Sequence, residues 1–180
     1  TYGFRPNILK TRKFHLFNRL TYIETHSGQI ESRDNMTGIW NTFQNGSYLF
    51  VGYIQNYEHL VQSFEIKKDV LIPEGIYKFN QMTASYESDK SRRFAFHAET
   101  SFGQFYNGQL FRVGTNGFLK INRHFNLEFI LERNQFNLPV DEGKFTTNIA
   151  ATRAIYSFTP DLFVKAFIQW NDSEKLFKSN

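Results

Sequence analysis

The chain has no cysteine among its 180 residues, which excludes a disulfide scaffold and the thiolate zinc sites that cysteines build. Long hydrophobic runs are also missing, since the longest are short stretches such as Leu49-Phe50-Val51 and Val70-Leu71-Ile72. The sequence therefore predicts no transmembrane helix. Charge of one sign is not concentrated either: 21 basic and 17 acidic residues leave a net charge of +4. We interpret the densest basic stretch, Lys10-Thr11-Arg12-Lys13, as a strand end and predict no binding of nucleic acid.

What the chain does contain is an alternation of apolar and polar residues, which is clearest where Leu127, Phe129 and Leu131 alternate with Glu128 and Glu132. Successive side chains of a strand point to opposite faces, so such a segment has one apolar and one polar face. The alternation recurs in residues 94–102, 111–121 and 162–170. We predict that the apolar members face outward, among them Phe96, Val113, Leu127, Phe129, Leu131, Leu162, Val164 and Ile168. The polar residues predicted to face inward, toward a lumen, are His97, Glu99, Arg112, Lys120, Glu128, Glu132, Arg153 and Lys165.

Turn residues divide the chain into nine predicted strands, at 11–24, 30–44, 47–59, 75–88, 92–103, 108–122, 126–136, 145–158 and 161–171. These are longer than the five or six residues (roughly) of an ordinary strand, and they match the about 9–11 residues that cross a bilayer. Short connections such as Asn45-Gly46 alternate with long ones such as Leu60 to Glu74. That parity is typical of an up-and-down barrel with tight turns on one rim and longer loops on the other.

The predicted fold class is therefore all-β: an antiparallel up-and-down meander of long strands, part of a transmembrane outer-membrane-type β-barrel. Residues 1–180 are predicted to form a single barrel segment of a larger protein, because nine strands is odd and single-chain bacterial barrels close with an even number. A soluble β-protein whose apolar faces make a core is the alternative. Two belts of aromatic residues are expected to flank the apolar band: Phe43, Tyr48, Tyr86, Phe94, Phe125 and Phe158 near the short turns, and Tyr22, Phe102, Tyr106, Phe136, Phe145 and Trp170 near the longer loops.

Four stretches carry a resemblance to a known family: Pro73 to Phe79, Gly103 to Gly108, Leu138 to Thr146, and Phe158 to Asn171. They resemble the C-terminal barrel of a Bacteroidota family of large outer-membrane proteins of unassigned function. The N-terminal domain of that family is similar to a family 9 carbohydrate-binding module. The resemblance implies a bacterial outer-membrane location and a link to glycans.

Catalytic chemistry has one candidate pair. His97 and Glu99 share a face, as a metal pair or an acid/base pair would require. The alternative is a polar ladder in which Glu99 meets Arg112 of the neighbouring strand. Glu128 and Glu132 are too far apart along a strand for one glycosidase site, and we expect them to pair with Lys120, Arg153 or Lys165. No nucleophile elbow, phosphate loop or His-Glu-x-x-His motif is present, so we predict no catalytic residue, no metal ligand and no cofactor in this segment.

Two loops leave alternatives open. Residues 60–74 either fold over the barrel mouth or contact a partner, or else extend two long strands. Asp141 and Glu142, in the loop 137–144, form either a calcium site or a plain acidic turn.

The expected function is that of a membrane anchor in the bacterial outer membrane that also serves as a translocation or ligand-binding pore. The lipid bilayer is the expected partner, with a glycan or another small ligand bound through the remainder of the protein. The alternative is the barrel part of a membrane-associated hydrolase whose catalytic groups lie outside this segment, so whether the protein is an enzyme stays open.

Overall fold

A computed structural model describes residues 2–5, 8, 10–172 and 176–179, and these residues form strands and turns without any helix. The short strands are β1 (Tyr2–Phe4), β5 (Phe64–Lys67), β6 (Val70–Ile72) and β13 (Leu176–Ser179). The long strands are β2 (Thr11–Glu24), β3 (Ile30–Phe43), β4 (Tyr48–Leu60), β7 (Gly75–Glu87), β8 (Phe94–Phe105), β9 (Gly108–Lys120), β10 (Phe125–Asn137), β11 (Lys144–Ser157) and β12 (Phe163–Asn171).

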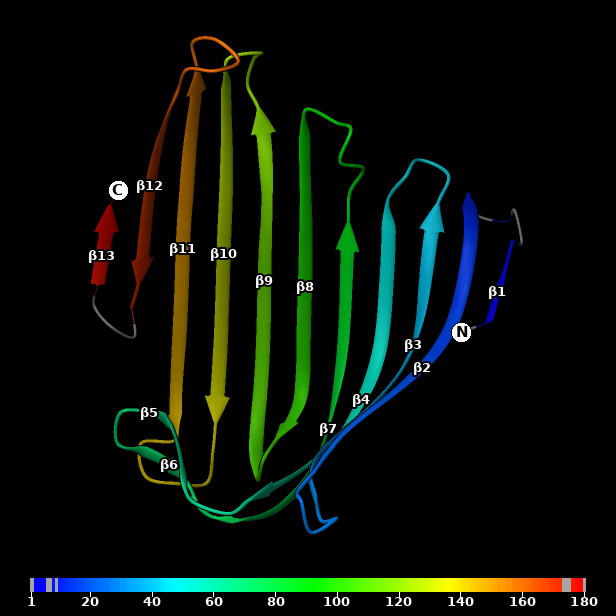
Figure 1. The fold of residues 1–180 in the computed structure, drawn as a ribbon, viewed down its shortest axis with the longest axis vertical. Helices are drawn as coiled ribbons and strands as arrows, with labels where there is room; N and C mark the ends of the chain where they lie inside the picture. The colour runs from blue at the N-terminus through cyan, green and yellow to red at the C-terminus, as the bar shows by residue number, and fades with distance from the viewer. Residues whose placement is uncertain (1, 6–7, 9, 173–175, 180) are drawn as a thin grey trace.

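Within the described residues, eleven strands form one sheet in the order β1-β2-β3-β4-β7-β8-β9-β10-β11-β12-β13, and β5 pairs only with β6. Every pairing is antiparallel, for example between β10 and β11, so the predicted meander is confirmed. The sheet is not closed, because β1 and β13 lie at its two edges (Figure 1). The nine predicted strands are the nine long strands, with ends displaced by two residues or fewer. Leu162 lies one residue before β12, and the Phe158 backbone N–H donates to its carbonyl at 2.9 Å, so it continues the pairing of β11 with β12 on the same face as Val164.

The short turns end strands by local hydrogen bonding. Between β3 and β4, Gly46 adopts a positive φ of 86°, a conformation that glycine reaches without strain. The Asn45 Oδ1 atom accepts hydrogen bonds from the Ser47 backbone N–H at 3.1 Å and from the Ser47 hydroxyl at 2.7 Å. The turn thereby returns the chain directly into β4, with Thr42 opposite Tyr48.

The registers place the long strands' side chains on two chemically different faces. Leu131 lies opposite Thr115 of β9 and Ala150 of β11, whereas Glu132 lies opposite Gly114 and Ile149. We call the face that carries Leu131 the apolar face and the face that carries Glu132 the polar face. The polar face is concave, because polar-face residues of β2 and β8 line one groove although β3, β4 and β7 lie between them. The apolar face is therefore convex.

The best-buried side chains lie at the long-loop end of the sheet. Val70 and Ile72 of the β5–β6 hairpin are each only 1% exposed. At the same end, aromatic rings of the polar face pack together, with Phe136 and Phe145 stacked at 4.7 Å between ring centroids. The Lys67 ammonium nitrogen lies 4.8 Å from the centre of the Phe145 ring, so the hairpin reaches across to β11.

The placement of this hairpin decides between the two interpretations of residues 60–74. Figure 1 shows it beside the loop that joins β10 to β11, away from the continuous strands β4 and β7 that it connects. The segment therefore folds over the end of the sheet instead of extending two strands. No helix in the described part of the chain has the length and apolarity needed to cross a bilayer.

Part of the aromatic-belt prediction is wrong. Tyr48, Phe136 and Phe145 lie on the polar face, since they are in register with Thr42, Leu110 and Phe136 of that face. Their positions near the strand ends match an aromatic belt. Their odd or even position along each strand, however, places them on the polar face, whereas a belt must lie on the apolar face. Phe94, Phe102 and Trp170 do lie on the apolar face, opposite Leu119, Phe111 and Ala150.

Candidate functional site

All eight side chains predicted to face inward lie on the polar face. His97 and Glu99 project from β8, Arg112 and Lys120 from β9, Glu128 and Glu132 from β10, Arg153 from β11 and Lys165 from β12. The registers place them on one face, since Glu99 lies opposite Gly114, Arg153 opposite Glu128, and Lys165 opposite Ile155. Whether this face lines a water-filled lumen stays a prediction.

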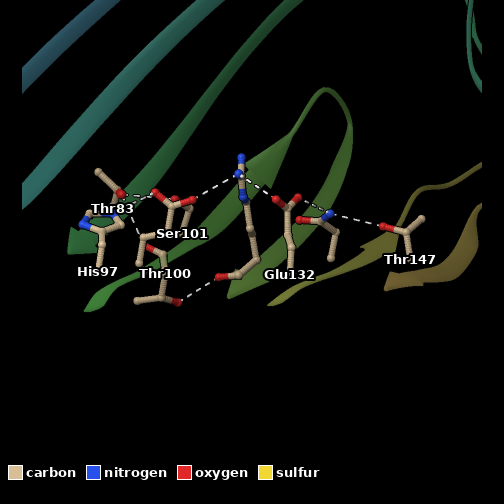
Figure 2. A network of polar contacts seen from close by, with 9 residues as sticks. Thr83, His97, Thr100, Ser101, Glu132 and Thr147 are labelled. Carbon is tan, nitrogen blue, oxygen red and sulfur yellow. Dashed lines mark hydrogen bonds and ion pairs between the residues drawn. The ribbon is translucent and has the colours of Figure 1, made fainter. Parts of the chain in front are cut away.

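A continuous line of polar contacts crosses five strands of this face, from Glu87 of β7 to Thr147 of β11. Figure 2 shows the part of this line from His97 to Thr147. We call it the polar ladder and define it by Glu87, His97, Glu99, Arg112, Glu132, Asn134 and Thr147. The His97 imidazole lies between two carboxylates, with Nδ1 4.0 Å from Glu87 Oε2 and Nε2 3.5 Å from Glu99 Oε2. Further along, Asn134 Nδ2 donates to Glu132 Oε1 at 2.9 Å and to Thr147 Oγ1 at 3.2 Å.

Arg112 joins the two halves of the ladder. Its Nη2 atom lies 3.1 Å from Glu99 Oε1 and 3.2 Å from Glu132 Oε2. Gly114 makes room for this arrangement, because it stands opposite both Glu99 and Glu132 and presents no side chain between them. A Cβ atom on Gly114 would lie 3.4 Å from Glu99 Cγ. One cation thus bridges two carboxylates over a glycine.

The remaining charged residues of the polar face match the expected pairs only in part. Arg153 Nη1 binds Glu128 Oε2 at 2.8 Å, which confirms one expected pair. Glu132 pairs with Arg112, so the expectation that its partner is Lys120, Arg153 or Lys165 is wrong. Lys120 and Lys165 instead place their ammonium nitrogens over Phe118 and Phe163, at 5.0 and 4.7 Å from the ring centres.

The ladder does not assemble a nucleophile with a base. His97 and Glu99 are close, but Glu99 is held by Arg112. The nearby Ser101 hydroxyl donates to Thr83 Oγ1 at 3.1 Å (Figure 2). Among the described residues, no three His, Cys, Asp or Glu side chains are grouped to hold a metal ion, and this includes Asp141 and Glu142. Chemically, the ladder presents carboxylates separated by the His97 imidazole and the Arg112 guanidinium, a row of polar groups that can bind water and small ions.

A second feature of the polar face was missed by the sequence reasoning. A groove of about 990 Å³ lies over β2, β3, β4, β7 and β8. Four aromatic residues contribute to it, namely Phe17, Trp40, Tyr48 and Phe50, together with the basic residues Lys13, His15 and Arg19. A signal existed in the sequence, because Lys13, His15, Phe17 and Arg19 alternate along one strand and must share a face.

Two turns carry a titratable group whose pKa is shifted from its usual value. Burial raises the pKa of Tyr106, in the β8–β9 turn, above its usual value, and Glu58 and Tyr77 add to the rise. Hydrogen bonds from the backbone and hydroxyl of Ser91 hold the pKa of the Asp89 carboxyl below its usual value, and Arg92 contributes in the same direction. Neither group touches the ladder, so neither marks a catalytic centre there.

Comparison of the chain with protein-family models, with curated proteins and with solved structures gives no match in any of the three. Function must therefore be argued from the two faces of the sheet.

Proposed function

We propose that the chain is a segment of a membrane-embedded β-barrel, which anchors the protein in the bacterial outer membrane and lines a pore that translocates or binds a ligand. The observation that carries this proposal is the contrast between a convex apolar face and a concave polar face on the same strands. Lipid would cover the first, and water would fill the space enclosed by the second.

The apolar face supports this proposal by its extent. Large apolar side chains of this face are exposed on every long strand. On the apolar face of residues 94–102, 111–119, 125–131 and 164–170, the described side chains include no Asp, Glu, Lys or Arg. From Phe94 to Phe102 the strand covers about 27 Å, or about 20 Å along the normal at a tilt of about 40°. A barrel's outward apolar band is about 25 Å tall.

The direction of curvature is the second support. In a soluble sheet, an apolar face of this size would be covered by another layer, and large uncovered apolar patches mark interaction surfaces. Here the hairpin that could have covered it lies at the end of the sheet, with Lys67 against Phe145 of the polar face. A bilayer is the partner that matches a convex surface without charged side chains over residues 94–102, 111–119, 125–131 and 164–170.

The proposal makes one structural demand. Unpaired backbone groups are not tolerated in hydrocarbon, so the edges at β1 and β13 must find further strands in the membrane. The outer-membrane location and the link to glycans rest on the resemblance described above, and they are part of the proposal on that ground alone.

The two tryptophans provide the test. Trp170 lies on the apolar face and Trp40 on the polar face, with nearly equal exposed fractions of 44% and 47%. We would reconstitute Trp40→Phe and Trp170→Phe, each with one remaining tryptophan, into vesicles of brominated phosphatidylcholine. Bromine quenches tryptophan on contact, so we expect strong quenching of Trp170 and weak quenching of Trp40.

Equal quenching of the two tryptophans would contradict the proposal, as would a chain that folds in water with neither residue quenched. Vesicles of unbrominated phosphatidylcholine are the control for effects of lipid other than contact. Circular dichroism of both variants checks that the strands are formed.

A further inference from the structure

The aromatic groove has an unusual floor. Phe50 lies over two glycines that face each other, Gly38 of β3 and Gly52 of β4. A Cβ atom on Gly38 would lie 2.8 Å from Phe50 Cε2, and one on Gly52 would lie 2.6 Å from Phe50 Cζ. Because neither glycine has a side chain, the ring lies down against the sheet. Phe17 continues the surface, with its ring 5.6 Å from that of Phe50 at an interplanar angle of 29°.

The floor is bordered by two further aromatic residues. Trp40 and Tyr48 lie toward the short turns, with ring centroids 6.0 Å apart in an edge-to-face arrangement. Trp40 stands opposite Phe50, and both lie on the polar face. These rings are therefore on the side of the sheet that otherwise carries the polar ladder, where apolar packing against lipid cannot explain them.

The charges around the floor are unbalanced. Lys13 and Arg19 of β2 line the groove, and among the described residues no carboxylate lies within ion-pair distance of either. The carboxylate that lines the opposite wall, Glu87, lies 3.0 Å from Lys90 and is already paired. The groove thus combines a flat apolar floor with unpaired positive charge on one wall.

We propose that this groove binds a small organic anion that carries a six-membered ring, with one face of the ring stacked on Phe17 and Phe50 and the anionic group held by Arg19, which lies two residues from Phe17 on the same face of β2. Ring faces stack favourably on aromatic side chains. Arginine and lysine donate strong charge-assisted hydrogen bonds to carboxylate, sulfonate and phosphate oxygens. The volume of about 990 Å³ suits a ligand of two or three rings. Sugar acids and aromatic acids share this chemistry, and the experiment separates them.

The binding of a ring anion depends on the proposed membrane function in one respect: the concave polar face must be open to water. The two fail separately. A chain that binds a ring anion but shows no contact between Trp170 and brominated lipid would overturn the membrane proposal and leave this one standing.

The test is isothermal titration calorimetry of the full chain, folded in vesicles, with four probes. Trigalacturonate and naphthalenesulfonate are the ring anions, maltotriose carries rings without charge, and sulfate carries charge without a ring. We expect saturable binding of at least one ring anion, and binding of maltotriose and sulfate weaker by about tenfold or more. The ring anion that binds more tightly identifies the ligand as a sugar acid or an aromatic acid.

Variants locate the site. Arg19→Gln should weaken binding by about tenfold, the loss of one charge-assisted hydrogen bond. Lys13→Gln, six residues away along β2, should weaken binding less. Lys120→Gln and Lys165→Gln, which remove cations from the same face far along the sheet, should leave the affinity unchanged. The fluorescence of Trp40 in the Trp170→Phe chain should change on binding of the ring anion that binds more tightly, and that of Trp170 in the Trp40→Phe chain should not.

Three results would overturn the proposal: no ring anion binds more tightly than maltotriose or sulfate; Arg19→Gln binds as the parent chain does; or the two tryptophans respond equally to the ring anion that binds more tightly. All four lysine and arginine substitutions are at side chains of the polar face, and circular dichroism of each variant checks that the strands are formed.

Discussion

Ile130 and Leu131 are neighbours on β10 with almost the same exposed fraction, 48% and 49%, yet they lie on opposite faces of the sheet. Leu131 is flanked across the strands by Thr115 and Ala150, within a continuous apolar surface. Ile130 is flanked by Asn116 and Ala151, and its neighbours along the polar face are Glu128 and Glu132. Exposure alone does not distinguish the two side chains. The chemistry of the surrounding face distinguishes them, because it predicts that Leu131 meets lipid and Ile130 meets water.

The largest expected effect is that of arginine at Leu131, and it tests directly whether Ile130 and Leu131 face different media. Leu131→Arg should destabilise the protein in lipid vesicles by about 2–4 kcal/mol, because it places a charge on a lipid-facing strand near the membrane centre. Ile130→Arg should change the stability by less than about 1 kcal/mol, since its side chain would face water. Urea titration of the protein folded in vesicles measures both free energies of unfolding.

The pair is matched in position, strand and exposure, so propensity and backbone effects cancel between the two variants. Val164→Arg on β12, which is also exposed on the apolar face, repeats the test on a second strand. Equal changes at Ile130 and Leu131 would show that both faces meet the same medium, as in a soluble β-protein.

The faces themselves could be predicted from the sequence because side-chain direction in a strand has a period of two. Once Leu127 and Glu128 are assigned to opposite faces, every residue of that strand follows. Asn45-Gly46 fixed the turn between two strands, because few other dipeptides accept the positive φ that the tight turn requires. The strand positions and the eight polar-face residues were therefore accessible without coordinates.

Partners across strands were accessible only in part: the contacts of Glu99 with Arg112 and of Glu128 with Arg153 were expected and are present, but the partner of Glu132 was not expected. The partner of Glu132 depends on how far β9 is displaced along β10, and this displacement is set by the turn and by the packing of both faces. Arg112 stands opposite Asn134, and it reaches Glu132 only because Gly114 leaves the intervening position empty. A list of charged residues with the right parity could not select Arg112 over Lys120.

The hairpin and the groove were hidden for a different reason. Val70, Leu71 and Ile72 form a continuous apolar run, which has no periodicity to show whether it lies in a strand of the main sheet or in a separate hairpin. Tyr48 was assigned to a lipid belt from its position beside a turn, although its parity placed it on the polar face opposite Thr42. Aromatic residues favour strands on either face, so composition did not reveal the groove.

The second prediction tests whether the β5–β6 hairpin packs on the long-loop end of the sheet as a buried core. Ile72→Ala should destabilise the hairpin by about 2 kcal/mol, the lower end for removing a buried branched side chain, because a short hairpin can partly collapse into the cavity. Leu71→Ala is the matched control, since Leu71 is 51% exposed whereas Ile72 is 1% exposed. Hydrogen exchange of the amides in residues 64–72 measures the effect. Equal protection in the two variants would show that the hairpin does not pack on the sheet.

The third prediction concerns the ladder and is smaller, because its ion pairs are partly exposed. Arg112→Gln should lower the free energy of unfolding by about 1 kcal/mol, since it leaves Glu99 and Glu132 close together without their shared cation. Arg153→Gln removes the cation from a single carboxylate and should have a smaller effect. A double-mutant cycle of Arg112→Gln with Glu132→Gln isolates the pairwise energy, and a coupling of zero would show that the ladder contributes nothing to stability.

The smallest expected effect tests the packing of the aromatic turn at the polar face's long-loop end. Tyr106 packs against Tyr77 and Phe105, with ring centroids 5.0 and 4.9 Å away, and burial raises its pKa above the usual value of a tyrosine. A folded pKa above the unfolded pKa of about 10 means that the contribution of Tyr106 to stability is complete below that pH. The contribution is lost as the pH rises through the folded pKa, because the unfolded phenol ionises first.

Tyr106→Phe should therefore flatten the fall in stability on the alkaline side and remove one late-titrating phenolate from the ultraviolet titration. If the free energy of unfolding of the parent and of the variant falls with the same slope against pH, the ring of Tyr106 is solvated. The contrast between a packed long-loop end of the polar face and an exposed apolar face is then weaker than the structure indicates.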